Sequence, residues 1–194
     1  MKNFLLSFIL FFIYQLSFGQ TTYNLAPEDG VKVSVKGNST LHEWEAVASE
    51  ITDYPATVAT DLKSNKGFEN FGFKVGVESL DGGRGASMNK KIKKALISND
   101  HPNIVFASTS VNLMPGESAN QGQIKSIGTL EIAGHVIEVE VDALANLQDD
   151  QLIISGSKAL KMSDFGIEPP TAMFGQIKTR DDIVVHFEFR YVKE

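Results

Sequence analysis

The chain has 194 residues, with 18 Lys and Arg against 24 Asp and Glu, a formal net charge of −6, and no cysteine. The absence of cysteine excludes disulfide bonds, thiol chemistry and a lipid anchored on sulfur. The acidic balance argues against nucleic acid as a partner, because phosphate contacts need concentrated positive charge.

The first 19 residues have the pattern of a secretory signal peptide. A positive charge precedes the uncharged run Phe4–Phe18, and the small residues Ser17 and Gly19 form a cleavage site before Gln20. A membrane anchor is the alternative, but a spanning helix needs about 20 apolar residues and this run is shorter. We therefore expect cleavage, a periplasmic or secreted location without a stable membrane span, and one mature domain over residues 20–194.

Most of the remaining sequence alternates between apolar and polar residues with a period of two, which is typical of strands with one buried face. The alternation is clearest in residues 31–36, 71–78, 137–142 and 183–191. Less regular strands are expected over residues 42–51, 56–62, 103–113, 123–133 and 151–160. Turn residues at Ala133-Gly134, at 146–151 and at Asp181-Asp182 predict hairpin connections between antiparallel strands.

One long connection, from Leu80 to Pro102, contains an amphipathic helix. Apolar residues at positions 88, 92, 95 and 96 have the spacing of a buried helical face, so the four lysines between 90 and 94 are expected to be solvated. Ser87 is the expected N-cap of this helix. The connection is long enough to lie across an open end of a barrel.

About eight or nine antiparallel strands with one apolar face favour closure of the sheet. Such a sheet can bury its apolar face as two packed layers or as a barrel, and a barrel also removes exposed edges. The interior of an eight-stranded barrel is either filled by side chains or holds one small ligand. The residues alone leave both outcomes open.

Five motifs in order along the chain resemble the YceI-like polyisoprenoid-binding family. They lie at Gly37–Trp44 (GNSTLHEW), Phe73–Leu80, Met88–Phe106, Gly128–Gly134 (GTLEIAG) and Lys161–Pro170 (KMSDFGIEPP). The resemblance implies an all-β fold: an antiparallel, up-and-down, eight-stranded lipocalin-like barrel with one amphipathic helix in a long connection. It also implies an internal tunnel that binds an isoprenoid chain, such as a polyprenyl phosphate or a quinone tail, without catalysis. Where many members carry Thr followed by Lys or Arg after the Gly134 turn, this chain has His135-Val136.

Strand alternation predicts which side chains face the interior and would contact such a ligand. This set comprises Val33, Val35, Phe71, Phe73, Val75, Phe106, Leu130, Val139, Phe187 and Phe189. Trp44 joins it as a residue that lines the tunnel mouth or wedges a barrel corner. Ordinary core packing is the alternative for each of them.

We expect no catalytic residue, metal site or cofactor. His42-Glu43-Trp44-Glu45 resembles the start of a zinc-protease helix, but Ala46 stands where the second His is required. The leading expectation is a non-enzymatic protein that sequesters or transports an isoprenoid or other long-chain apolar ligand. A filled barrel that acts as a structural or interaction module, and an enzyme for a small apolar substrate, are the alternatives. The sequence leaves a homodimer open.

Overall fold

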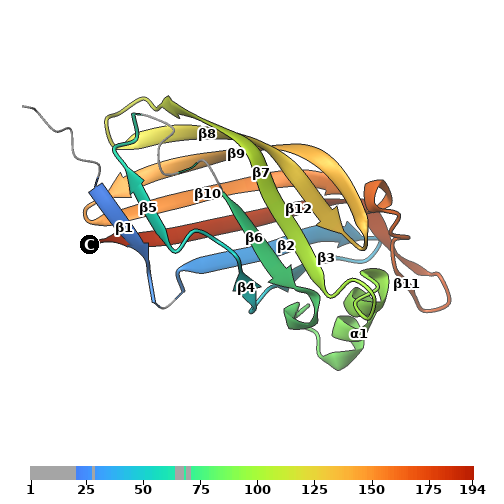
Figure 1. Ribbon diagram of the computed structural model, residues 1–194. Coiled ribbons are helices and arrows are strands. Elements are labelled where there is room, and N and C mark those ends of the chain that lie inside the picture. Colours follow the sequence, from blue (N-terminus) through green and yellow to red (C-terminus); the bar gives the residue numbers. More distant parts are fainter. Residues whose placement is uncertain (1–20, 28, 64–67, 69–70) are drawn as a thin grey trace, which may run out of the picture.

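The computed structural model describes residues 21–27, 29–63, 68 and 71–194, so the expected signal peptide lies outside the described residues. One antiparallel sheet dominates the fold (Figure 1). Its strands are β1 (Thr21–Leu25), β2 (Val31–Ser39), β3 (Glu43–Val47), β4 (Ile51–Thr52), β5 (Thr57–Thr60), β6 (Gly72–Gly76), β7 (Asn103–Pro115), β8 (Gln121–Ile132), β9 (His135–Gln148), β10 (Gln151–Lys161), β11 (Thr171–Ala172) and β12 (Ile177–Lys193). The helical elements are α1 (Ala86–Ala95) and the 3-10 turns η1 (Val77–Ser79) and η2 (Met162–Phe165). None of the helices in the described ranges has the length and hydropathy that a membrane span requires.

The sheet curls until its two ends meet on one segment of the chain. The hydrogen-bonded path runs β3-β2-β12-β10-β9-β8-β7-β6-β4, and β3 and β4 are consecutive in sequence. Between them, the Ala48 N–H donates to the Val33 carbonyl, and the Glu50 carbonyl accepts from the Gly76 N–H. Residues 43–52 therefore bridge β2 on one side and β6 on the other, which leaves few unpaired edge groups.

The all-β, antiparallel, lipocalin-like fold is confirmed, whereas the strand count differs from eight. The described residues form twelve strands in one sheet. The predicted strand at 42–51 is split into β3 and β4, while β1, β5 and β11 pair outside the main path. Residues 57–60, predicted as a strand, therefore pair with β1 instead of joining the ring.

The predicted turns are correct at two of three places. Ala133 and Gly134 both have positive φ, 49° and 78°, as a two-residue hairpin turn of the primed type requires, and they join β8 to β9. Asp149 and Asp150 join β9 to β10. Asp181-Asp182 is not a hairpin connection: these residues lie inside β12, where the pairing with β2 shifts register between Thr179 and Ile183.

Helix α1 forms where the apolar spacing predicted it, but its N-cap differs. The cap is Gly85, with φ of 78°, and Ser87 lies in the first turn of the helix. Glycine suits this position because it adopts positive φ without the steric penalty of a side chain. Figure 1 shows α1 beside the β11–β12 hairpin, at the end of the barrel opposite the C-terminus.

Packed side chains fill the end of the barrel that β1 and β5 cover. Leu152, Ile154, Phe189 and Tyr191 are each at most 1% exposed, and the register places Leu152 opposite Tyr191 and Ile154 opposite Phe189. The Tyr191 hydroxyl donates a 3.0 Å hydrogen bond to the Pro55 carbonyl. This end is therefore closed by a core plug, and any cavity must lie toward α1.

The buried phenol of Tyr191 predicts a dependence of stability on alkaline pH. Burial raises the pKa of Tyr191 well above its usual range. The unfolded chain releases this proton near pH 10 while the folded chain retains it, so the contribution is complete below about pH 10 and is lost as the pH rises further. We expect the free energy of unfolding to fall more steeply in the wild type than in Tyr191→Phe, by up to about 1.4 kcal/mol per pH unit.

Guanidinium unfolding between pH 8 and 11 measures this difference. At neutral pH, Tyr191→Phe should lower the free energy of unfolding by only about 1 kcal/mol, the typical net contribution of one hydrogen bond. Parallel stability curves for the two proteins above pH 10 would contradict the role of the buried phenol.

Candidate functional site

The interior widens where β9 separates from β10. These strands pair from Gln151 opposite Gln148 only as far as Gly156 opposite Ala143. Beyond that point η2 contacts both strands and covers the gap. Because no ladder holds β9 against β10 there, side chains of η2 replace a strand contact, and the barrel is wider at the α1 end than at the plugged end.

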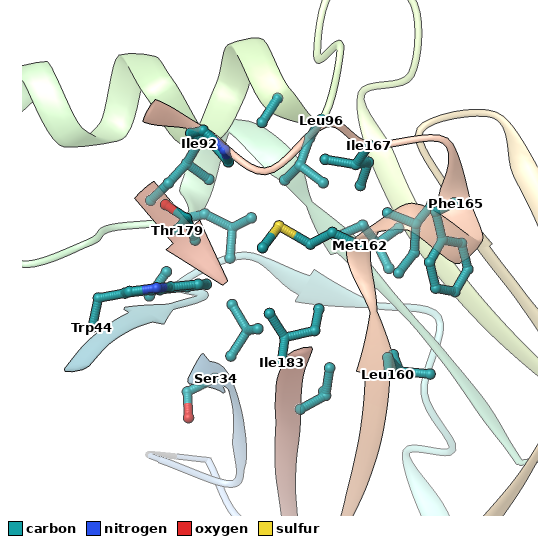
Figure 2. A pocket seen from close by; sticks show the side chains of 18 of the residues that line it. Ser34, Trp44, Ile92, Leu96, Leu160, Met162, Phe165, Ile167, Thr179 and Ile183 are labelled. Carbon is teal, nitrogen blue, oxygen red and sulfur yellow. The ribbon is translucent and has the colours of Figure 1, made fainter. Parts of the chain in front are cut away.

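An apolar cavity of about 360 Å³ occupies this wider end. Its wall combines strand residues with α1, η2 and the β11–β12 hairpin. Figure 2 shows Ile92 of α1 and its C-cap Leu96 on one side, Trp44 and Ile183 on the other, and Met162 of η2 between them. The volume lies within the range of about 300–1,000 Å³ that is usual for small-molecule sites.

Helix α1 covers the cavity with the face that its sequence pattern predicted. Met88, Ile92 and Leu96 are half-buried and line the cavity. The chain before the helix approaches it closely, since a side chain on Gly82 would collide with Met88. Asp81 accepts hydrogen bonds from the Gly83 N–H and the Asn89 amide, which hold the pKa of Asp81 below its usual range. These contacts fix the entry into α1.

A cluster of phenylalanine rings forms the inner limit of the cavity. Phe73, Phe106 and Phe187 line it. Phe189 lies behind them, with its ring centroid 5.7 Å from that of Phe73, 6.3 Å from that of Phe187 and 5.0 Å from that of Phe71. Such offset and edge-on contacts pack the rings into the plug. The cavity therefore has the shape of a cup, and these phenylalanine rings form its closed end.

Cationic side chains lie among the polar lining residues. Arg84 Nη1 lies 2.7 Å from His42 Nε2. A guanidinium can only donate, so Arg84 is the donor in this contact, and His42 Nδ1 lies 3.4 Å from Ser39 Oγ. Lys91 and Lys158 also line the cavity, and among the described residues no Asp or Glu does. The lining thus favours anionic over cationic groups.

Trp44 supplies an unused hydrogen-bond donor. Its indole lines the cavity and packs over Gly37, where any Cβ would collide with the ring. The Nε1 atom is buried and has no hydrogen-bond partner. An unsatisfied buried donor costs about 1–3 kcal/mol, so an acceptor atom on a bound molecule would recover this energy.

The structure brings together eight of the eleven side chains that the sequence suggested for ligand contact. Those lining the cavity are Val33, Val35, Trp44, Phe73, Val75, Phe106, Leu130 and Phe187. Phe71, Val139 and Phe189 do not line it: Phe189 and Val139 are buried in the core, and Phe71 is partly buried against Phe189. Contact with a ligand remains a prediction for the whole set.

Sequence reasoning missed a second group of lining residues. Its apolar members include Leu160, Met162, Phe165, Ile167 and Ile183, and its cationic members are Arg84, Lys91 and Lys158. The motif Lys161–Pro170 contains three of them and was a signal for this region, although nothing in the spacing showed that η2 turns inward. Arg84 lies in a glycine-rich turn whose path no periodicity predicts.

A wider groove of about 840 Å³ is a weaker candidate. It runs over polar side chains of β2, β8, β10 and β12, among them Lys32, Gln123, Ser155 and Glu188. Phe187 points into the barrel, so His186 and Glu188 on either side of it face solvent. Within the described ranges, no three His, Asp or Glu side chains group as a metal site.

Comparison with known proteins agrees with this architecture. BcnA from Burkholderia cenocepacia superposes with a TM-score of 0.61 at 18% identity, covering 82% of this chain and 95% of BcnA. A polyisoprenoid binding domain from Saccharophagus degradans, implicated in plant cell wall breakdown, superposes with a TM-score of 0.62 at 11% identity. The match covers 90% of this chain and 99% of that domain. The Campylobacter jejuni YCEI protein superposes with a TM-score of 0.56 at 18% identity, covering 77% of this chain and 84% of that protein. No curated protein matches the chain.

At these identities the structural matches establish the fold alone. The sequence itself also matches the model of the YceI-like domain over residues 23–191, which includes every element described above except the ends of β1 and β12. The chain therefore belongs to the YceI-like domain family.

Proposed function

We propose that this protein is a non-enzymatic carrier or sequestering protein for an isoprenoid-type lipid, and that it acts in the periplasm or after secretion. The observation that carries the proposal is the apolar cup of about 360 Å³ with a cationic rim. The similar fold of the polyisoprenoid binding domain from Saccharophagus degradans supports the same ligand class. The signal-like pattern of residues 1–19 supports export.

Burial supplies the affinity in this proposal. Each methylene group transferred from water into the cup gains about 0.8 kcal/mol, so ten such groups would gain about 8 kcal/mol before the cost of association. The inward faces of β2, β6, β7 and β12 provide the apolar surface. The chain of the ligand would enter at the α1 end and stop at Phe73, Phe106 and Phe187.

The head group would remain at the rim, where hydrogen-bond donors gather. Arg84 and Lys91 offer charge-assisted donors and the Trp44 N–H offers a neutral one. An enzyme acting on an apolar substrate would need an acid and a base converging on one atom. The titratable lining residues are His42, Arg84, Lys91 and Lys158, and the His42 Nε2 is already occupied by Arg84. This arrangement favours binding over proton transfer.

Native mass spectrometry with organic extraction tests the function directly. The protein is isolated from its export compartment without detergent, and the proposal expects a stoichiometric long-chain isoprenoid. Trp44 is the only tryptophan of the chain, so its fluorescence reports binding of an added polyprenyl lipid at the cavity wall. A ligand-free protein whose Trp44 emission does not change on titration would instead support the structural or interaction module.

Two adjacent valines of β12 provide a matched test of the cavity. Val185 lines the cup, whereas the alternation of the strand turns Val184 to the other face. Val185→Phe should weaken binding about tenfold, since overpacking a filled apolar site costs about 1–3 kcal/mol. Val184→Phe should bind as the wild type does. Equal affinities in a Trp44 fluorescence titration would place the ligand elsewhere.

The rim predicts a preference for an anionic head group. We expect the Arg84→Ala/Lys91→Ala variant to lose at least about tenfold in affinity for a prenyl phosphate and little for the matching prenyl alcohol, since hydrogen bonds to charged groups are worth about 1.5–3 kcal/mol. Lys90→Ala is the control, because this neighbouring lysine does not line the cavity. Equal losses for phosphate and alcohol would show that these side chains act on the fold instead of the head group.

A further inference from the structure

The open end of the barrel carries an exposed apolar tip beside a lysine-rich helix. We define the rim surface as Leu41, Met173 and Phe174 together with Lys90, Lys91 and Lys94. Leu41 and Met173 are 67% and 64% exposed, and Phe174 is fully exposed. Large apolar side chains gathered at one end of a molecule, next to positive charge, indicate a surface that meets another phase or partner.

The apolar tip lies on a tight turn whose base is tied to the neighbouring loop by hydrogen bonds. Met173, Phe174 and Gly175, which join β11 to β12, have φ of 51°, 55° and 86°. Bulky residues adopt positive φ at a cost of about 1–2 kcal/mol, so nothing local favours presenting a phenylalanine here. The Thr40 N–H donates to the Lys178 carbonyl and the Thr40 hydroxyl accepts from the Lys178 N–H, which ties the Leu41 turn to the base of the same hairpin.

The tip and the helix flank the same opening. Residues 170–172 and 177 of the hairpin line the cavity, as do Ser39, His42 and Lys91. The hydrogen bond between Arg84 and His42 joins the turn before α1 to the turn that carries Leu41. Figure 1 shows α1 and β11 at one end of the molecule. The rim surface therefore surrounds the entrance that a ligand must use.

Helix α1 concentrates positive charge beside the entrance of the cavity. Helix α1 has four lysines and no acidic residue, and only Lys93 is neutralised, by Glu78 at 2.8 Å. Lys90, Lys91 and Lys94 are exposed, and within the described residues none of them forms an ion pair. Carboxylates also occur around this end, among them Glu43, Asp81, Asp100 and Glu168, but none of them lies within α1. The opposite end carries the Asp149-Asp150 turn and Glu117 instead of a basic cluster.

We infer that the rim surface docks the protein on a bilayer containing anionic phospholipids, with the cavity entrance facing the membrane. The inference rests on the proposed function, because a long apolar chain is dissolved in a membrane and not in water. Exposed Phe and Met side chains insert at the interface, while lysines interact with anionic head groups at about 1 kcal/mol each. A protruding apolar tip next to lysines suits a fluid anionic lipid surface, in which apolar side chains insert while cations contact the head groups.

Vesicle co-sedimentation of the protein isolated from its export compartment tests the inference. The probes are vesicles of phosphatidylcholine alone and vesicles containing about one third phosphatidylglycerol, at low and physiological salt. We expect binding to the anionic vesicles only, and weaker binding at higher salt because screening shortens the reach of the lysines to about 8 Å. Lys90→Glu/Lys94→Glu should reduce binding at least about tenfold, as should Met173→Ser/Phe174→Ser.

Matched controls lie away from the rim. Lys63→Glu changes a lysine outside α1, and Leu144→Ser removes an apolar side chain that is 53% exposed on β9. Both should bind anionic vesicles as the wild type does. Absence of binding to anionic vesicles, or binding that the rim variants and the controls change equally, would overturn the inference.

A second measurement distinguishes docking on the membrane from binding of the ligand in the cavity. The rim substitutions Lys90→Glu/Lys94→Glu and Met173→Ser/Phe174→Ser leave the cavity lining intact, so uptake of a short, water-soluble prenyl phosphate should be unchanged in the Trp44 titration without vesicles. If the wild type takes up this ligand but does not bind vesicles, the docking inference alone is contradicted. A wild type that binds vesicles but takes up no prenyl lipid would contradict the proposed function.

Discussion

One face of β12 builds both the closed and the open part of the interior. This strand pairs with β10 along eleven positions and with β2 on its other side, so its orientation is fixed by two ladders. Alternation then places Phe189 and Tyr191 in the plug and Ile183, Val185 and Phe187 around the cavity. The boundary between core and cavity is set within a single strand, and the rest of the site is arranged around it.

The cavity exists because one ladder of the barrel is incomplete. Strands β8 and β9 pair from Gln121 to the Ala133-Gly134 turn, but β9 and β10 separate after Gly156. Gly156 also leaves room for the Phe187 ring, which would collide with any Cβ there. The same residue therefore marks the end of the pairing and admits the ring that closes the cup from below. Covering the gap with η2, instead of further strand, supplies Met162 and Phe165 to the wall.

Periodicity predicted the faces of the strands, and the motifs of the family resemblance predicted the barrel. Neither gives a position along the barrel axis: Phe187 and Phe189 have the same alternation, yet the first lines the cavity and the second is packed behind it. Residues outside regular elements were also missed, since Arg84 and Ile167 lie in turns whose paths depend on contacts far away in sequence. The prediction of a hairpin connection at Asp181-Asp182 was wrong for a related reason, because polar residues within a bulged strand have the composition of a turn.

The distribution of charge links the cavity to the surface around it. In a chain of net charge −6, the cavity lining contains Arg84, Lys91 and Lys158 and, among the described residues, no carboxylate. Lys91 belongs both to this lining and to the basic face of α1, so the potential that would hold an anionic head group continues onto the outside of the molecule. A lipid moving from an anionic surface into the cup would keep a cation beside its head group throughout. The free-energy cost of leaving the membrane would then fall mainly on the apolar chain, for which the cup supplies an apolar wall.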